Sequence, residues 1–209
     1  MKNLFLFLFL LVVFTSKAQD NRVSGLNSRQ FTKYWKVESE SPDYKVTFQG
    51  DTAEIVSPKG LTLWRKEKMS GKVTIEYDAC VVVESDGDRL SDLNCFWMAS
   101  DPQYPDNLWK REKWRSGIFL NCYSLQLYYL GYGGNHNSTT RFRRYDGDES
   151  GITNPKARPA ILKEYTDAGH LLKPNHWYHI KITNENNRVS YYIDGCLLYT
   201  SPSPRDATL

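Results

Sequence analysis

The sequence predicts an all-β protein built as a two-sheet antiparallel β-sandwich. Many short segments alternate between apolar and polar residues, which is the period-two pattern of a strand with one buried face. Gly, Asp, Asn and Pro separate these segments and mark turns. Apolar residues recur at helical spacing almost nowhere in the chain. Many short strands joined by turns favour a sandwich or a barrel.

The predicted strands follow one another along most of the chain. The longest covers residues 73–83, where Ile75 and Tyr77 share one face and Glu76 points to the other. The Asn-rich residues 184–187 predict a hairpin turn before the last strand. The other predicted strands are residues 45–48, 53–56, 61–64, 93–99, 117–121, 125–130, 139–145, 177–183 and 189–194. Long connections, which often carry function, are predicted at residues 87–92, 101–115 and 146–174.

Residues 1–18 have the features of a secretory signal peptide. Lys2 precedes an unbroken apolar run over residues 4–14, which is too short to span a bilayer comfortably. We therefore expect an exported protein, periplasmic or extracellular, with no membrane insertion after cleavage behind Ala18. Loss of the two lysines in this segment lowers the formal charge from +3 to +1. A nearly neutral protein offers no electrostatic argument for nucleic-acid binding.

Residues 19–195 are predicted to form one domain, and residues 196–209 are predicted to be an artefact. The final stretch reads CLLYTSPSPRDATL and resembles the read-through translation of a transposase sequencing adapter. In that case the genuine sequence stops near Gly195, inside a strand, and the domain is truncated. Pro202 and Pro204 cannot donate ladder hydrogen bonds, so no sheet partner is expected from Thr200 onward. The alternative is a natural tail rich in Ser and Pro.

Five segments, taken in order, resemble a known family. They are residues 94–99 (NCFWMA), 115–119 (RSGIF), 131–135 (GYGGN), 139–145 (TTRFRRY) and 177–182 (WYHIKI). Their order resembles a family of poorly characterised secreted or pathway-associated proteins with the concanavalin A-like lectin/glucanase jelly roll. Relatives in that family tend to be encoded among rhamnogalacturonan- and other polysaccharide-degrading enzymes. The resemblance covers most of residues 30–195 and implies a jelly roll that handles a carbohydrate. It also implies a closing Gly-Phe-Arg strand that this chain lacks, which agrees with a truncated domain.

Two better-known activities of this fold lack their motifs here. Retaining glucanases of the jelly-roll type carry a Glu-x-Asp-x-x-Glu strand that supplies the nucleophile and the acid. Jelly-roll alginate lyases carry a Gln-x-His strand and a Tyr-x-Lys-x-Gly strand. The chain contains none of these patterns, so neither activity is transferred to it.

The candidate catalytic residues are His136, Arg141, Arg143 and Tyr145. Strand alternation places both arginines and Tyr145 on one face, where the arginines can clamp a uronate carboxylate. A lyase that acts on uronates needs such a clamp together with a base, and His136 or Tyr145 is a suitable base. The alternative is that these arginines form solvated pairs with local carboxylates.

The candidate sugar-binding residues are aromatic or carry amide side chains. They are Asn94, Trp97, Trp109, Trp114, Tyr128, Tyr132 and Asn135. An aromatic ring can stack on the apolar face of a pyranose. We expect Tyr128 or Tyr132 at the wall of a groove that contains the two arginines, and core packing is the alternative for Trp97.

No metal ion or cofactor is predicted. The turn that contains Asp86, Asp88 and Asp92 is compatible with Ca²⁺, but its spacing is not that of an EF-hand, and Asp-Gly is a common turn signal. Cys80, Cys95 and Cys122 lie in apolar, strand-like segments, which favours buried thiols over disulfides.

Two functions remain open on the sequence. The first is an enzyme, a lyase or hydrolase, that acts on an acidic, pectin-like polysaccharide of rhamnogalacturonan type or on its fragments. The second is a non-catalytic, lectin-like module that binds a polysaccharide or oligosaccharide in the same groove.

Overall fold

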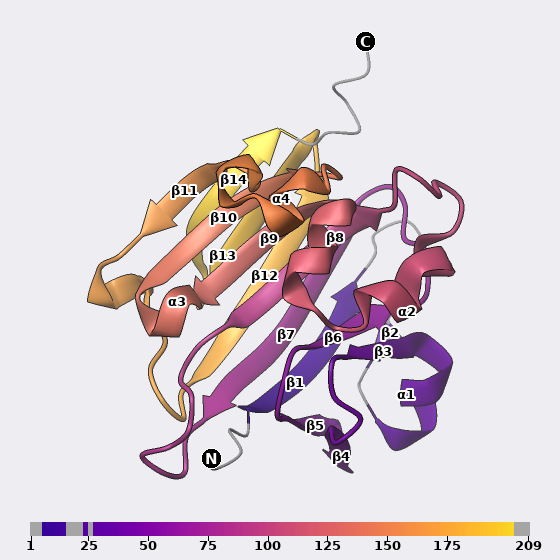
Figure 1. The fold of residues 1–209 in the computed structure, drawn as a ribbon. Helices are drawn as coiled ribbons and strands as arrows, with labels where there is room; N and C mark the ends of the chain where they lie inside the picture. The colour runs from indigo at the N-terminus through magenta and orange to yellow at the C-terminus, as the bar shows by residue number, and fades with distance from the viewer. Residues whose placement is uncertain (1–5, 16–22, 25–26, 203–209) are drawn as a thin grey trace.

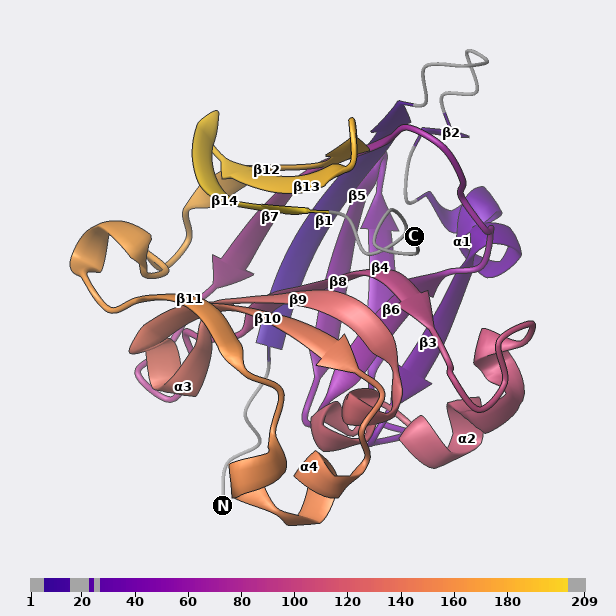
Figure 2. The ribbon, with the colours of Figure 1, turned by 90° about the horizontal axis from the view of Figure 1, so that it is seen from above.

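The computed structural model describes residues 6–15, 23–24 and 27–202. Within this part of the chain, two antiparallel sheets face one another and a two-stranded ribbon lies beside them (Figure 1). Figure 2 shows β12 and β13 in one layer and β9 and β10 in the layer opposite. The predicted two-sheet antiparallel β-sandwich is confirmed.

The back sheet, the front sheet and the ribbon account for the described strands. The back sheet has the spatial order β14 (Cys196–Pro202), β13 (Arg188–Ile193), β12 (Trp177–Glu185), β7 (Val73–Val82), β1 (Leu6–Thr15), β5 (Thr52–Ser57) and β4 (Lys45–Gln49), with β2 (Val23–Ser24) beside β1. The front sheet has the order β11 (Ile161–Tyr165), β10 (Thr139–Asp146), β9 (Gln126–Gly133) and β8 (Leu93–Ser100). The ribbon pairs β3 (Trp35–Ser39) with β6 (Leu61–Arg65).

Short helices fill the long connections. They are α1 (Ser28–Tyr34), η1 (Leu108–Arg111), α2 (Glu112–Arg115), η2 (Phe119–Ser124), α3 (Gly134–Asn137), α4 (Ser150–Thr153), η3 (Pro155–Ala157) and η4 (Ala168–His170). Figure 1 shows α2 and α4 on the side of the front sheet that faces away from the back sheet. They restrict access to that outer face.

The front sheet is apolar on both faces because its strands alternate between two cores. On β9, Tyr128 and Leu130 point into the core between the sheets, whereas Leu127 and Tyr129 point to the outer face. The outer face joins a second core with side chains from η2, among them Tyr123. This double burial leaves only part of the outer face open for a ligand.

The prediction of a strand over residues 117–121 is wrong, because this segment leads into the 3₁₀ helix η2. Ser116 and Gly117 have φ angles of 45° and 73°, which an extended strand does not allow. Gly117 is required there, because a Cβ atom would lie 2.7 Å from the carbonyl oxygens of Glu38 and Gly60. The chain therefore turns at Gly117, where the β5–β6 connection approaches it.

Strand β1 belongs to the segment that the sequence predicts to be a signal peptide. Its backbone pairs with β5 and β7 in the middle of the back sheet. The predicted cleavage region lies outside the described residues, so the signal peptide stays a prediction. Of the helices in the described part of the chain, none is long and apolar enough to cross a membrane.

The expectation that pairing ends before Thr200 is wrong. The ladder between β13 and β14 continues to the pair Arg188 and Pro202. The hydroxyl of Tyr128 donates a 2.7 Å hydrogen bond to the Pro202 carbonyl, which fixes this end of the strand. Pro202 is tolerated because it ends an edge strand. The origin of residues 196–209 stays a prediction, and those from 203 onward lie outside the described residues.

Candidate functional site

A cleft of about 1580 Å³ lies along the front sheet and is lined by residues from both of its faces. The part on the outer face contains the candidate arginines. Its floor includes side chains from three neighbouring strands, and the strand register aligns them in rows. The first row is Asn94, Gly131 and Arg141, and the second is Phe96, Tyr129 and Arg143. Tyr145 continues the floor along β10. We call this region the groove.

Gly131 shapes the first row because it has no side chain. A Cβ atom there would lie 2.1 Å from the Tyr129 hydroxyl oxygen, so the tyrosine side chain extends over this glycine. The same hydroxyl lies 3.1 Å from Asn94 Oδ1 and donates a hydrogen bond to it. Burial raises the pKa of Tyr129 well above its ordinary value. The phenol therefore stays protonated at neutral pH and holds Asn94 in place.

The second row continues into a packed aromatic layer. The rings of Trp64 and Phe96 stack with centroids 5.8 Å apart, and Phe119 meets Tyr129 edge-on at 5.4 Å. Tyr145 lies under this layer, with its ring centroid 5.0 Å from that of Tyr123. Phe119 is 36% exposed, so it offers an accessible apolar ring beside the groove.

The two groove arginines have different partners. Arg141 is ion-paired with Glu164, which lies opposite it on β11. Arg143 donates instead to the carbonyl oxygen of Pro159. This contact brings Arg143 close to Arg158, an exposed residue that also lines the cleft. Among residues 27–202, no carboxylate lies within ion-pair distance of Arg143 or Arg158.

Both of these guanidinium groups act on Tyr123 as well. Burial raises the pKa of the Tyr123 hydroxyl, and the positive charges of Arg158 and Arg143 oppose that rise. The two arginines thus produce a positive potential at one end of the groove, above the aromatic layer. An anionic group is the natural partner for that position.

The predicted catalytic residues do not meet at one point. His136 is exposed on the left-handed turn that precedes β10, with φ 57°, whereas Tyr145 lies near the other end of that strand. The six steps from Thr139 to Tyr145 span roughly 20 Å at the rise of a β-strand. Tyr145 is 1% exposed, and burial raises its pKa well above the ordinary value, so it is a poor base at neutral pH.

Three of the predicted sugar-binding residues point into the core between the sheets. Trp97, Tyr128 and Tyr132 are buried, and the ring centroids of Trp97 and Tyr128 lie 5.5 Å apart in a stacked arrangement. Their positions on β8 and β9 have the opposite parity to the groove residues. Tyr129 lies in the groove, whereas Tyr128 lines the same cleft from the core side of the sheet and Tyr132 does not line it.

Of the remaining predicted sugar-binding residues, Trp109 and Asn135 line the cleft and Trp114 does not. Trp109 is half-buried at the cleft, and Lys36 Nζ lies 5.3 Å from its ring centroid. Trp114 is 43% exposed and does not line the cleft. Asn135 is exposed next to His136 and donates to Thr139 Oγ1 at 3.2 Å.

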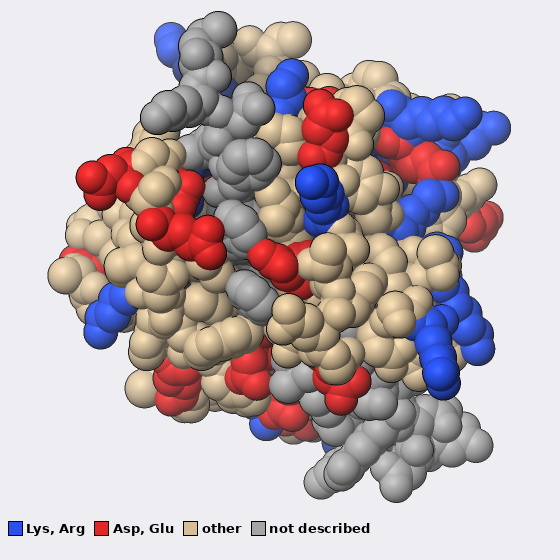
Figure 3. Space-filling model, turned by 90° about the horizontal axis from the view of Figure 1, so that it is seen from below, with Lys and Arg blue, Asp and Glu red and all other residues tan. Residues whose placement is uncertain are grey.

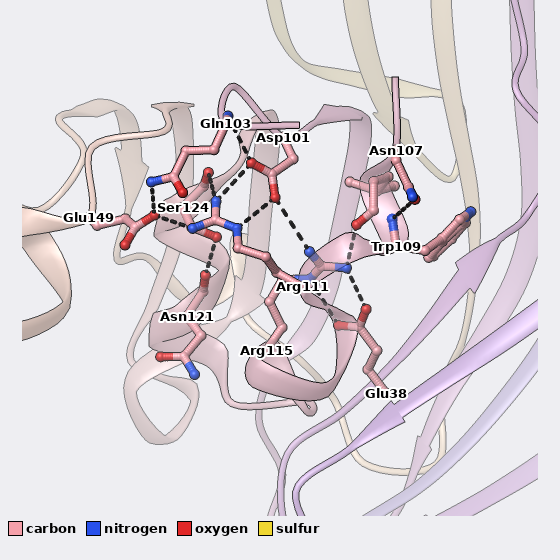
Figure 4. Close-up of polar contacts among 11 residues, drawn as sticks. Glu38, Asp101, Gln103, Asn107, Trp109, Arg111, Arg115, Asn121, Ser124 and Glu149 are labelled. Atoms are coloured by element: carbon pink, nitrogen blue, oxygen red, sulfur yellow. Dashed lines mark hydrogen bonds and ion pairs between the residues drawn. The ribbon is translucent and has the colours of Figure 1, made fainter. Parts of the chain in front are cut away.

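A buried ion network, which the sequence did not predict, holds the segment beside the groove (Figure 4). Arg115 is fully buried and makes two hydrogen bonds to Glu38, of 2.6 Å and 3.1 Å. Arg111 makes two hydrogen bonds of 2.8 Å to Asp101 and pairs with Glu149. The network therefore joins β3, the residue that follows β8, the η1–α2 segment and the N-cap residue of α4.

The carboxylates of the acidic turn before β8 have partners within the protein. Hydrogen bonds from the amides of Glu84 and Ser85 lower the pKa of Asp88. Asp92 is paired with Arg89. Among the residues whose side chains are described, no group of three or more His, Cys, Asp or Glu is placed to hold a metal ion.

The four cysteines are free thiols. Burial raises the pKa of Cys95 and of Cys122 to about 12, so both stay protonated at neutral pH. The expected buried thiols are confirmed for Cys80 and Cys122, while Cys95 is partly buried.

Comparisons with known proteins place the chain in a family. A family model described as a domain of unknown function, DUF6250, matches residues 55–208. The match spans more than half of the chain, so the chain belongs to that family. A solved structure of carbohydrate binding module CBM66 from Bacillus subtilis is similar at a TM-score of 0.38 and 12% sequence identity, over 81% of this chain and 79% of that chain. No curated protein matches the chain.

Proposed function

We propose that this member of the DUF6250 family is an exported protein that binds an acidic, pectin-like polysaccharide in the groove. The observation that carries the proposal is the pair Arg143 and Arg158. Both arginines line the cleft, and neither has a carboxylate partner among the described side chains. A ligand that brings its own carboxylate would complete this pair.

Guanidinium groups suit a uronate for geometric reasons. A planar guanidinium can donate two parallel hydrogen bonds to one carboxylate, which favours both affinity and orientation. The Pro159 carbonyl fixes one nitrogen of Arg143 and leaves its remaining donors for a ligand. A neutral sugar cannot form the charge-assisted bonds, so the groove should discriminate by charge.

The aromatic layer supplies the second part of sugar recognition. A pyranose ring has an apolar face of C–H groups that packs against aromatic rings. Phe119 is the exposed member of the layer and lies beside Tyr129. Asn94, held by the Tyr129 hydroxyl, retains an amide group that can donate to a sugar hydroxyl. The floor thus combines a ring, an amide and two cations.

Binding is favoured over catalysis by the protonation states in the groove. A lyase needs a base close to the acidic proton of the uronate, within hydrogen-bond distance. Tyr129 and Tyr145 have raised pKa values because of burial, and His136 lies at the opposite end of β10 from Tyr145. The family resemblance implies a substrate of rhamnogalacturonan type, so rhamnogalacturonan is included among the polysaccharides tested for product formation.

The test is calorimetric titration with a galacturonate trimer and with a neutral galactose trimer. We expect binding of the acidic trimer alone, and a loss of about tenfold or more in affinity for the variant Arg143→Gln/Arg158→Gln. Lys173→Gln, an exposed change outside the cleft, is the control. Equal affinity of the double variant and the control for the acidic trimer would overturn the proposal. Formation of unsaturated products from a polygalacturonate or rhamnogalacturonan panel would instead establish a lyase.

A further inference from the structure

The molecule carries a second cationic surface, on the side where α1 and α2 lie. Figure 3 shows Lys and Arg atoms gathered along the same side of the molecule. We call this surface the basic ridge, and its members are the exposed lysines Lys33, Lys66, Lys110 and Lys113. They come from α1, the end of the β3–β6 ribbon, η1 and α2. The ridge contrasts with a sequence whose overall charge is close to neutral.

The buried ion network determines which cations face outward on the η1–α2 segment. Arg111 and Arg115 turn inward to Asp101, Glu149 and Glu38 (Figure 4). Lys110 and Lys113, which alternate with them in sequence, remain exposed. Because the arginines anchor the segment on both sides, the two lysines are held at fixed positions and not on a free loop.

The carboxylates beside the ridge are already neutralised. Glu112 is paired with Lys36, and Glu67 is paired with Arg65. Lys36 also lies over the Trp109 ring, which connects β3 to the η1–α2 segment. Among the described side chains none of the four ridge lysines is ion-paired with a carboxylate, although Lys66 Nζ donates to the Thr32 carbonyl oxygen. Their charge therefore lies next to an aromatic side chain that can contact sugar rings.

The ridge is continuous with the groove. Lys66 and Trp109 line the same cleft as Arg143 and Arg158. We infer that the ridge is a second contact surface for a long acidic polysaccharide whose end or middle occupies the groove. This inference rests on the proposed function for its choice of ligand. Lys110 and Lys113 do not line the cleft, so a trimer held in the groove should not contact them, whereas a polymer that continues past Lys66 should.

The experiment compares two double variants that remove the same charge. Lys110→Gln/Lys113→Gln removes two ridge lysines, and Lys45→Gln/Lys173→Gln removes two exposed lysines that lie neither on the ridge nor at the cleft. Each variant and the wild type are titrated with polygalacturonate and with the galacturonate trimer at low ionic strength, and circular dichroism checks that each is folded.

We expect the ridge variant to lose about three- to tenfold in affinity for the polymer and nothing for the trimer. The control variant should bind both ligands as the wild type does. Equal polymer affinity of the two variants would overturn the ridge and leave the groove proposal intact. If the wild type binds the polymer through the ridge but fails to bind the trimer, the groove proposal fails and the ridge stands. A third titration, with single-stranded DNA, tests the class of ligand. An equal loss of affinity for DNA in the ridge variant would overturn the assignment to a glycan.

Discussion

Arg115 and Arg143 both lie next to the aromatic layer and have opposite surroundings. Arg115 is fully buried, bonded twice to Glu38, with Asp101 Oδ2 at 4.0 Å from its Nη1. Arg143 is half-exposed, bonded to one backbone carbonyl and without a carboxylate. One guanidinium has its anions inside the protein, and the other faces an open cleft.

The comparison separates structural charge from charge that is available to a ligand. A buried ion pair adds little net stability, because desolvation of both ions offsets their attraction. It does fix geometry, since breaking it leaves an isolated charge in the interior. The network at Arg111 and Arg115 positions the wall of the groove, while Arg143 and Arg158 supply its unbalanced charge.

Glu38→Ala should give the largest effect, on stability. It leaves the Arg115 guanidinium buried without its main partner, which costs about 3–5 kcal/mol for a buried pair. Urea unfolding followed by tryptophan fluorescence measures the free energy of unfolding. Glu164→Ala, which removes the partner of the half-exposed Arg141, should cost no more than about 1 kcal/mol. A similar loss in the free energy of unfolding for Glu38→Ala and Glu164→Ala would show that burial does not distinguish the two arginines. If Glu38→Ala fails to fold, Glu38→Gln serves as the milder variant.

Glu164→Gln should have a smaller effect, which is a gain in affinity for the acidic ligand. The change removes the carboxylate paired with Arg141 and leaves a third unneutralised guanidinium in the groove. Affinity for the galacturonate trimer should rise by about two- to fivefold. This factor corresponds to the free energy of a half-exposed ion pair. Calorimetry at low salt measures it, and the gain should disappear at high salt because exposed charges are screened. An unchanged or lower affinity would place Arg141 outside the ligand's path.

The sandwich and the faces of β10 were predictable because period-two alternation is a local property. Arg141 and Tyr145 lie on the face opposite to Phe142, as the sequence indicates. The choice between Tyr128 and Tyr129 was not predictable. Both faces of β9 are apolar, so no contrast between its residues reveals which of them faces the groove.

The buried ion network was hidden for a different reason. Its members are distributed from Glu38 to Glu149, and a segment rich in Lys and Arg is usually exposed. Only the fold brings Glu38 of β3 to Arg115 of α2. The positive φ at Gly117, which ends the predicted strand there, is set by contacts with the β5–β6 connection that are distant in sequence.

Tyr145→Phe should give the smallest effect, although the sequence predicts a catalytic role for this residue. The Tyr145 hydroxyl is buried and has no hydrogen-bond partner among the described residues. A buried hydroxyl without a partner is unfavourable, so its removal should leave the free energy of unfolding unchanged or raise it by up to about 1 kcal/mol. Trimer affinity should stay the same. Tyr129→Phe is the matched control, because it loses the hydrogen bond to Asn94 and should cost about 1 kcal/mol. A loss of about tenfold in affinity for Tyr145→Phe would mean that the ligand contacts this hydroxyl and would restore a role for Tyr145 in the groove.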